Sequence, residues 1–344
     1  EPEAKINKFH MDIASSIQKV TEEIMIKILK HIKNEFKEDN LCLAGGVALN
    51  CVANGLIKKM KIFKNIWIQP ASGDAGGSLG AALAFWNLHL KKKRVANNFD
   101  RMNGSFLGPT YSDKFIKYSL DEVGANYKKV KKSDMIKYTA NQLSKGKAIG
   151  WFQGRMEFGP RALGARSIIA DPRNKNMQKE LNLKIKFRES FRPFAPAVIE
   201  EDCSKWFDLD SSSPYMLLVS DVKKSKLVKN KTKSQTLSSI NNKRSIIPGV
   251  THVDDSARIQ TVNKSVNGVF FELIKEFKKI TKTPLVINTS FNIRGEPIVC
   301  NPTDAFKCFM GTNLDLLVIE NFILEKSKQK KELIKDYKSD FDLD

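Results

Sequence analysis

A chain of 344 residues, of which 41% are hydrophobic and 28% charged, is long enough for two domains with cores of their own. Its apolar runs are too short to cross a bilayer, and its five cysteines, which show no zinc-binding spacing, indicate a reducing cytoplasm. The net charge of +20 attracts phosphate-rich partners, but the basic runs carry few aromatic side chains for base stacking, so solvated lysines explain it better than nucleic-acid binding.

The first hundred residues predict an α/β domain. Apolar residues recur at steps of three and four over residues 12–36, which places one apolar stripe on a long helix. Short apolar runs at residues 41–44 and 66–68 are each followed by a glycine turn and a helical pattern. Two strand–glycine–helix units in succession are typical of α/β domains. The basic, Asn-rich residues 91–104 interrupt this pattern, so the first domain is assigned to residues 1–100.

The second domain is predicted over residues 101–325, followed by a charged, frayed tail over residues 326–344. Its clearest elements are a helix over residues 138–144, strands over residues 147–152, 285–287 and 314–319, and a helix that starts at Asn301-Pro302. Residues 223–244 are rich in Lys, Ser and Asn and poor in large apolar side chains, which predicts a surface insertion.

Two glycine turns form the first candidate site. Each lies between a strand and a helix, where unpaired backbone amides favour a phosphate or another anion. Glycine lets a ligand approach the main chain without a Cβ in the way, although it also suits tight packing. The second turn adds the carboxylate of Asp74, which can bind a metal or orient a hydroxyl. Repetition of the turn favours a nucleotide site; its candidate residues are Gly45, Gly46, Asn50, Gly76 and Gly77.

An arginine-rich loop, residues 154–167, is the most informative stretch. Arg155, Arg161 and Arg166 are separated by glycine and proline, so they lie on turns and not on one solvated helix face. Gathering guanidinium groups costs repulsion that a bound polyanion would relieve, because arginine binds phosphate and carboxylate oxygens in a bidentate manner. The loop therefore predicts an anion site.

Further polar and basic residues extend this second site. Lys186 and Arg188 alternate, so on a strand both would point to one face, and Glu189 can hold an arginine in position. The alternative is a solvated basic strand. Ser290 and Asn292 follow a predicted strand and offer hydroxyl and amide groups to phosphate oxygens. His252 lies in a polar segment near carboxylates and an arginine; a structural role and a binding role both remain open for it.

Taken in order, these motifs resemble the NodU-type O-carbamoyltransferases, which modify nodulation factors, aminoglycosides and cephems. Residues 44–50 and 73–77 resemble the second half of that family's catalytic domain, which has an actin-like, ribonuclease H-like fold. Three later stretches resemble its YrdC-like C-terminal domain, namely residues 154–167, 186–196 and 288–292. The resemblance implies an α/β protein with a partial actin-like lobe followed by a YrdC-like domain with a twisted mixed sheet.

The resemblance also implies a two-step, ATP-dependent reaction. The YrdC-like domain joins carbamoyl phosphate and ATP into carbamoyl adenylate, and the actin-like domain passes the carbamoyl group to an acceptor hydroxyl of a small molecule or sugar. Matched by motif, the residues that would bind the phosphates are Arg155, Arg161, Arg166, Lys186, Arg188, Ser290 and Asn292. Gly45, Gly46 and Asn50 would hold the adenylate. Neutralising several oxyanions suits the charge that develops in such a transition state.

Metals and partners follow from the same resemblance. Mg²⁺ is expected with ATP, and Fe²⁺ is expected at Asp74. The family's actin-like domain has an N-terminal half carrying the metal-binding histidines, and this sequence starts after it. One carboxylate holds a metal poorly, so the iron site is expected to be incomplete, and a separate N-terminal chain or a homodimer would complete it. We therefore expect a fragment or a split-gene product; the alternatives are a nucleic-acid-binding protein with a decayed enzyme fold and a non-catalytic subunit.

Overall fold

The computed structural model describes residues 6–95, 99–228, 243–334, 337 and 341. They form two compact units. Unit 1 comprises Glu1–Lys92 with Leu217–Val219, and unit 2 comprises Lys93–Met216 with Ser220–Asp344. The first segment of unit 1 ends at Lys92, whereas the sequence predicts the domain boundary at residue 100. In the described part of the chain, no helix has the length and apolarity that a membrane span needs.

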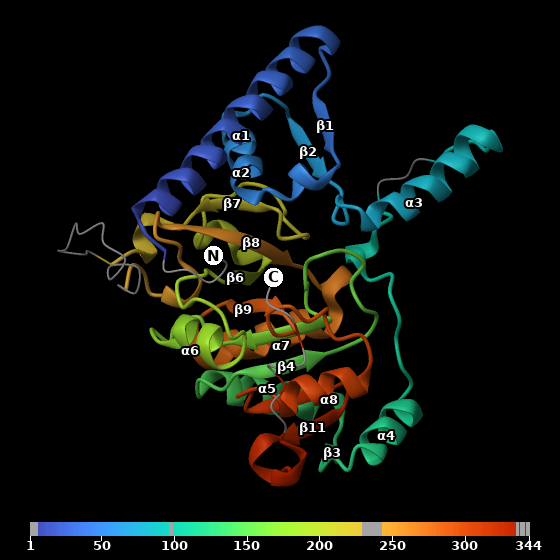
Figure 1. The fold of residues 1–344 in the computed structure, drawn as a ribbon, viewed down its shortest axis with the longest axis vertical. Coiled ribbons are helices and arrows are strands. Elements are labelled where there is room, and N and C mark those ends of the chain that lie inside the picture. The colour runs from blue at the N-terminus through green and yellow to red at the C-terminus, as the bar shows by residue number, and fades with distance from the viewer. Residues whose placement is uncertain (1–5, 96–98, 229–242, 335–336, 338–340, 342–344) are drawn as a thin grey trace. The chain divides into compact units, whose positions relative to one another are not determined.

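Unit 1 contains the two strand–glycine–helix units that the sequence predicts (Figure 1). The strands β1 (Asn40–Leu43) and β2 (Asn65–Ile68) pair in parallel. The helical elements are α1 (Lys8–Phe36), the short 3₁₀ helix η1 (Gly46–Leu49), α2 (Cys51–Met60), α3 (Ala75–Ala84) and the π-helical turn η2 (Phe85–His89). The long helix predicted over residues 12–36 is confirmed.

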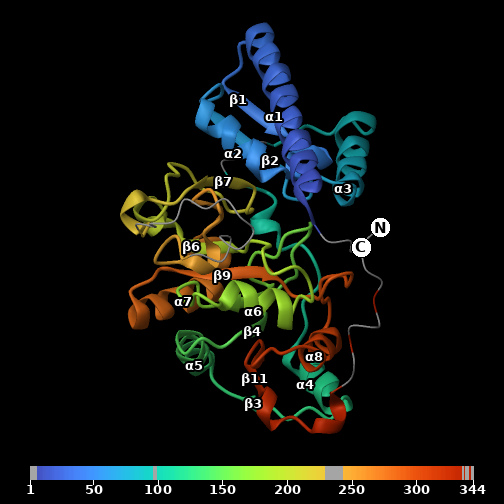
Figure 2. The same ribbon diagram turned by 60° about the vertical axis from the view of Figure 1, so that its left-hand side comes forward.

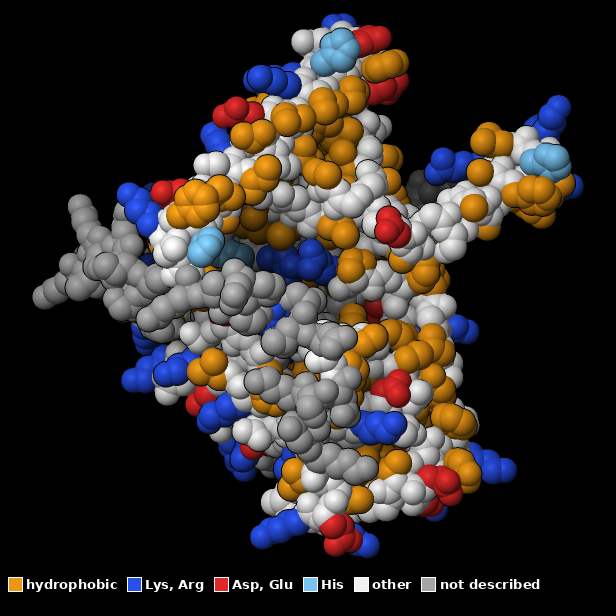
Figure 3. All heavy atoms as spheres, viewed as in Figure 1, with side chains coloured by type: hydrophobic (Ala, Val, Ile, Leu, Met, Phe, Trp, Pro, Cys, Tyr) orange, Lys and Arg blue, Asp and Glu red, His pale blue; other side chains and the backbone are white. Residues whose placement is uncertain are grey.

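The apolar stripe of α1 lies on an exposed face. Ile13, Ile17, Val20, Ile24 and Ile28 are each 49–63% exposed, and Figure 3 shows hydrophobic side chains along this helix. The core of unit 1 is built from other positions, namely Leu29, Leu41, Ile57 and Phe63, with Met25 and Ile32 packed against them. The periodicity therefore predicted the helix correctly but not the face that unit 1 buries.

Unit 2 is built on a mixed sheet whose nine strands have the order β3-β11-β10-β4-β5-β9-β6-β8-β7, although the first two residues of β7, Leu218 and Val219, are assigned to unit 1. Their bounds are β3 (Lys128–Lys129), β4 (Ile149–Phe152), β5 (Arg166–Ala170), β6 (Ala195–Ile199), β7 (Leu218–Asp221), β8 (Ser256–Val262), β9 (Leu285–Ser290), β10 (Leu316–Ile319) and β11 (Phe322–Glu325). Parallel and antiparallel neighbours both occur, since β4 pairs in parallel with β10 and antiparallel with β5. The expected mixed α/β sheet is confirmed.

Helices cover the sheet of unit 2 (Figure 2). They are α4 (Asp113–Glu122), α5 (Lys132–Ser144), α6 (Met177–Lys184), α7 (Lys264–Thr281) and α8 (Pro302–Met310). Side chains of α5 and α7 form one core with alternate residues of β4 such as Ile149 and Trp151. The intervening residue Gly150 packs against the Phe291 ring on the opposite face, because successive strand residues point to opposite sides.

Local sequence signals set the ends of several elements in unit 2. Asn301 caps α8 as predicted: its side chain accepts the Asp304 amide at 2.9 Å, and Pro302 occupies the first turn. In the predicted insertion, residues 229–242 lie outside the described part of the chain. At its base the Val228 amide donates to the Arg244 carbonyl at 2.8 Å.

Three described residues of the charged tail, Lys326, Gln329 and Tyr337, pack against other parts of unit 2. The ammonium group of Lys326 donates to the Phe309 carbonyl and lies 4.3 Å from the centre of the Phe309 ring. Gln329 is buried. Its side chain accepts a hydrogen bond from the Asn126 backbone amide at 2.9 Å and donates one to the Asn126 carbonyl at 2.7 Å. Tyr337 is buried as well. The fraying expected of residues 335–336, 338–340 and 342–344 falls outside the described part of the chain.

Candidate anion-binding site

The segment after α6 is irregular, which corrects the expectation of a basic strand. Helix α6 ends at Lys184, and residues 185–190 form bends and turns. Phe187 has a φ of 49°, in the left-handed region that extended strands do not use. Lys186 and Arg188 nevertheless line the same cavity, because this turn redirects the backbone between them.

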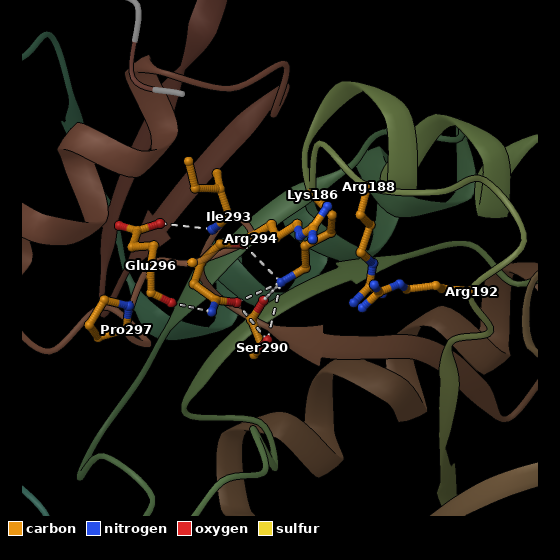
Figure 4. A pocket seen from close by; sticks show the side chains of 10 residues that line it. Lys186, Arg188, Arg192, Ser290, Ile293, Arg294, Glu296 and Pro297 are labelled. Atoms are coloured by element: carbon orange, nitrogen blue, oxygen red, sulfur yellow. Dashed lines mark hydrogen bonds between the residues drawn. The ribbon is translucent and has the colours of Figure 1, made fainter. Parts of the chain in front are cut away.

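The cavity has a volume of about 380 Å³ and is strongly cationic. Its lining comes from the segment after α6 and from the turn that follows β9 (Figure 4). The lining residues are Lys186, Arg188, Arg192, Ser290, Asn292, Ile293, Arg294, Gly295, Glu296 and Pro297. Four basic side chains thus face one carboxylate, a balance that favours an anionic ligand.

Lys186 is the buried centre of this cluster, with only 3% of its surface exposed. Its ammonium group donates to both oxygens of Ser290, with the hydroxyl at 3.1 Å, and to the carbonyl and side-chain oxygens of Asn292 at 2.8 and 2.7 Å (Figure 4). Burial lowers the pKa of Lys186 to about 7, and the neighbouring Arg188 charge adds to the effect. A bound anion would favour the protonated form.

Three arginines complete the cationic lining. The Arg188 side chain donates to the Asn182 side chain at 2.8 Å and lies over the Phe194 ring. Arg192 is held by Glu189 at 2.8 Å, so an arginine is indeed positioned by this carboxylate as predicted. In Figure 4 the side chains of Arg188 and Arg192 point toward one another. An anion bound between these two guanidinium groups would offset their mutual repulsion.

Arg294 and Glu296 were missed by the sequence analysis. Both lie on the turn after β9, and the Arg294 amide donates to the Lys186 carbonyl at 3.2 Å. The signal was present in the sequence as an arginine and a glutamate flanking Gly295, directly after the predicted Ser290 and Asn292 motif.

Arg166 is a structural residue in this arrangement. Its side chain is fully buried at the start of β5 and lies 3.5 Å from the centre of the Phe152 ring. Its guanidinium group donates to five main-chain carbonyls at 3.2–3.4 Å, which are those of Pro109, Gln153, Gly154, Ala165 and Cys300. Burial lowers the pKa of Arg166 to about 10, which leaves it charged. It holds distant segments of unit 2 together and does not line the cavity.

A buried carboxylate shapes the arginine-rich loop. Glu157 accepts the amides of Leu163, Ala165 and Arg166 at 2.6, 2.8 and 3.2 Å. The sheet supports the same loop, because the side-chain amide of Asn288 in β9 donates to the Ala162 carbonyl at 3.0 Å. These internal hydrogen bonds support the loop without a ligand.

Two arginines of this loop and a histidine lie apart from the described lining of the cavity. Arg155 is exposed and donates to the Gly108 carbonyl at 3.0 Å, while Arg161 is half-buried. His252 begins a tight turn before β8, with Nδ1 3.1 Å from the Ser256 hydroxyl. Burial lowers the pKa of His252 to about 4, so this imidazole is neutral at physiological pH.

The two glycine turns of unit 1 lie at the same edge of the β1–β2 pair, since parallel strands end together. Gly45 has a φ of 95°, and neither it nor Gly46 has an atom within 4 Å of where a Cβ would be, so both leave room for a ligand. Gly77 is similarly open. Gly76 is different, because a Cβ there would lie 2.0 Å from the Ala71 carbonyl oxygen. Its role is close packing.

The polar residues of unit 1 have local roles in the structure. Asn50 caps α2 by accepting the Ala53 amide at 3.1 Å, and it exchanges hydrogen bonds with the Gln18 side chain of α1. Asp74 is exposed at the start of α3 and makes no capping bond. In the part of the chain that the structure describes, no three His, Cys, Asp or Glu side chains form a cluster that could hold a metal. The residues present therefore do not fit an iron ion.

Comparisons with known proteins agree with these motifs. The family described as Carbamoyltransferase C-terminus matches residues 140–326, and the family described as Carbamoyltransferase N-terminus matches residues 2–83. The chain is 49% identical to the uncharacterized protein sll1178 of Synechocystis over 100% of its own length and 57% of that protein. It is 39% identical to the nodulation protein NolNO of Sinorhizobium fredii and 37% identical to NolO of Bradyrhizobium diazoefficiens, over 92% of this chain in each case and over 44% and 55% of those proteins. The chain thus spans about half the length of the curated relatives it matches.

Proposed function

Because the chain belongs to the carbamoyltransferase family, we propose that unit 2 forms carbamoyl adenylate from carbamoyl phosphate and ATP. The carbamoyl group then passes to an acceptor hydroxyl of a small molecule or sugar. In this proposal unit 1 is part of an actin-like lobe and unit 2 is a YrdC-like domain. The observation that carries the proposal is the cavity of about 380 Å³ with four basic side chains in its lining.

The cavity suits the phosphate end of the donor. Arg188 and Arg192 offer planar guanidinium groups that bind phosphate oxygens in pairs, and Arg294 adds a third positive charge. These groups would neutralise the phosphate that leaves when water cleaves carbamoyl phosphate to carbamate, which lowers the cost of the charge that develops on it. A carbamate oxygen would then attack the α-phosphorus of ATP and displace pyrophosphate, which gives carbamoyl adenylate. ATP would enter with Mg²⁺, and Arg155 and Arg161 on the neighbouring loop are proposed for its phosphates.

Binding of that phosphate would change the protonation state of Lys186. With a pKa of about 7 it is only partly charged in the empty cavity at neutral pH. A phosphate dianion nearby favours the ammonium form, so binding would take up a proton. The hydroxyl of Ser290 and the side chain of Asn292 already hold this amine in place, which leaves little reorganisation for the ligand to drive.

The transfer step is proposed for unit 1. The open turns at Gly45, Gly46 and Gly77 would hold the adenylate through backbone amides, with Asn50 nearby. Asp74 alone does not hold a metal, so no step is assigned to iron. We propose that a further chain, either the family's N-terminal half or a second copy, covers the exposed apolar stripe of α1 and supplies the missing ligands.

The first step can be tested with the purified chain by carbamoyl-phosphate-dependent exchange of pyrophosphate into ATP in the presence of Mg²⁺. Arg188→Ala and Arg192→Ala should each reduce the exchange rate roughly 10²-fold, the usual loss when one charge-stabilising donor is removed. Lys179→Met is the matched control, since it removes one positive charge from the exposed surface of α6 and should leave the rate unchanged.

The proposal fails if the folded chain shows neither exchange nor heat of carbamoyl phosphate binding. The competing hypothesis, a nucleic-acid-binding protein with a decayed enzyme fold, rests on the net charge of +20. It predicts RNA affinity that falls steeply with salt, and to which Lys179 and Arg188 contribute equally.

A further inference from the structure

A tyrosine of the tail packs onto the end of helix α8. Tyr337 is 8% exposed, and a Cβ placed on Gly311 would lie 2.1 Å from the Tyr337 Cβ. Glycine at position 311 is therefore needed for this close approach. The tyrosine ring also meets the Phe341 ring edge-on, with centroids 5.2 Å apart. Such close packing is unusual for a residue in a segment whose sequence is mostly charged.

The hydroxyl of Tyr337 reaches the wall of the cationic cavity. It donates to the Oε1 atom of Glu296, whose Oε2 atom accepts the Ile293 amide at 2.8 Å. Glu296 is 8% exposed and is the carboxylate among the described lining residues. Tyr337 thus holds the Glu296 carboxylate in place in a cavity lined by four basic side chains.

A short chain of bonds links this carboxylate to Lys186. The side-chain amide of Asn292 donates to the Glu296 carbonyl at 2.6 Å, and the carbonyl and side-chain oxygens of Asn292 accept hydrogen bonds from the Lys186 ammonium group. The turn from Asn292 to Glu296 is therefore bonded to Lys186 at one end and to Tyr337 at the other. Moving the Glu296 end would disturb the acceptors of the buried amine.

We propose that Tyr337 is a positioning residue for the cationic cavity, which acts by holding Glu296 and, through the 292–296 turn, the ammonium group of Lys186. The identity of the ligand rests on the proposed function, but the positioning of Lys186 does not. Tyr337 touches neither substrate nor nucleotide in this account, so it is not a catalytic residue.

The charges around the amine give the direction of the effect. Arg188 disfavours the charged form of Lys186, whereas Glu296 and the Cys308 thiol favour it, and Arg192 and Arg294 line the same cavity. Burial raises the pKa of Glu296, and the hydrogen bond from Tyr337 opposes that rise most among its partners. Without the tyrosine hydroxyl, Glu296 is ionised less, so its negative charge stabilises the ammonium form of Lys186 less and the pKa of Lys186 falls.

The test uses Tyr337→Phe in the full chain, with Tyr118→Phe as the matched control because Tyr118 is 62% exposed. The first measurement is the pH dependence of Lys186 modification by an amine-reactive reagent, followed by peptide mass spectrometry. Tyr337→Phe should move the midpoint to lower pH, and Tyr118→Phe should not. The second is binding of inorganic phosphate by calorimetry, which should weaken about tenfold in Tyr337→Phe, the change that corresponds to about 1.4 kcal/mol of lost stabilisation of the Lys186 charge.

Glu296→Gln provides a second route if Tyr337→Phe folds poorly. It should shift the Lys186 midpoint in the same direction, and the double variant should add nothing, because both changes act through one linkage. Equal midpoints and phosphate affinities in Tyr337→Phe and Tyr118→Phe would overturn the inference while leaving the proposed function intact. A wild-type chain that shows no exchange would defeat the proposed function, yet the labelling midpoint would still decide the role of Tyr337.

Discussion

Replacing Lys186 by Met should remove a pH-dependent part of the stability of unit 2. Lys186 is 3% exposed, and burial lowers its pKa from the ordinary 10.5 to about 7. Between pH 7 and pH 10.5, therefore, the unfolded chain carries a proton on this amine and the folded chain does not. Stability therefore rises with pH across this window, because the unfolded state must give up its proton. A methionine of similar length has no proton to bind.

The expected size follows from the two pKa values. Where the unfolded amine is charged and the folded amine is neutral, the free energy of unfolding rises by about 1.4 kcal/mol per pH unit. Between pH 7.5 and pH 9 the wild type should gain about 2 kcal/mol relative to Lys186→Met, allowing for partial protonation at the lower pH. Other groups that titrate in this range contribute equally to both proteins and cancel in the difference.

Urea unfolding at several pH values measures this difference. The fluorescence of Trp151 and Trp206 reports on unit 2, where both side chains are buried. Buffers must be free of phosphate, because a bound anion would favour the ammonium form. Added phosphate should flatten the pH dependence of the wild type and leave that of Lys186→Met unchanged.

A stability difference that stays constant from pH 7.5 to pH 9 would refute this reasoning. It would mean that Lys186 keeps its charge in the folded protein, with the four oxygens around it compensating for the loss of water. The cavity would then hold a permanent cation, and phosphate binding would no longer be coupled to proton uptake at this residue.

Four further substitutions test the framework of the protein, each by urea unfolding followed by circular dichroism. Glu157→Gln should cost about 2 kcal/mol, because an amide cannot accept all the main-chain amides that the carboxylate accepts; no loss would show that the loop holds its shape without them. Gly76→Ala should cost about 1–3 kcal/mol through its clash with the Ala71 carbonyl, whereas Gly77→Ala should be neutral or stabilising by up to about 1 kcal/mol; equal effects would contradict the packing described. Asn301→Ala should cost about 1 kcal/mol by removing the cap of α8, and an unchanged midpoint would mean that packing alone sets this helix end.

Local patterns in the sequence were sufficient to predict much of the secondary structure. The three- and four-residue steps of α1, the two strand–glycine–helix units and the cap at Asn301 depend on neighbours within a few positions, so they can be recognised without a fold. The convergence of Lys186 with Ser290 and Asn292 was expected only from the family resemblance, since no local pattern relates residues a hundred positions apart. The mixed sheet brings them together by ordering β5, β9 and β6 side by side.

The tertiary structure decided what each charged or apolar residue does. Arg155, Arg166 and Lys186 have the same sign of charge, but one is exposed, one is bonded to main-chain carbonyls and one centres a cavity. The isoleucines of α1 repeat as core residues do, yet they lie on an exposed face, and Tyr337 in a charged tail is buried. Sequence determined these helices and turns because their energies are local. Burial and pairing depend on which distant segments meet, and that is a property of the whole fold.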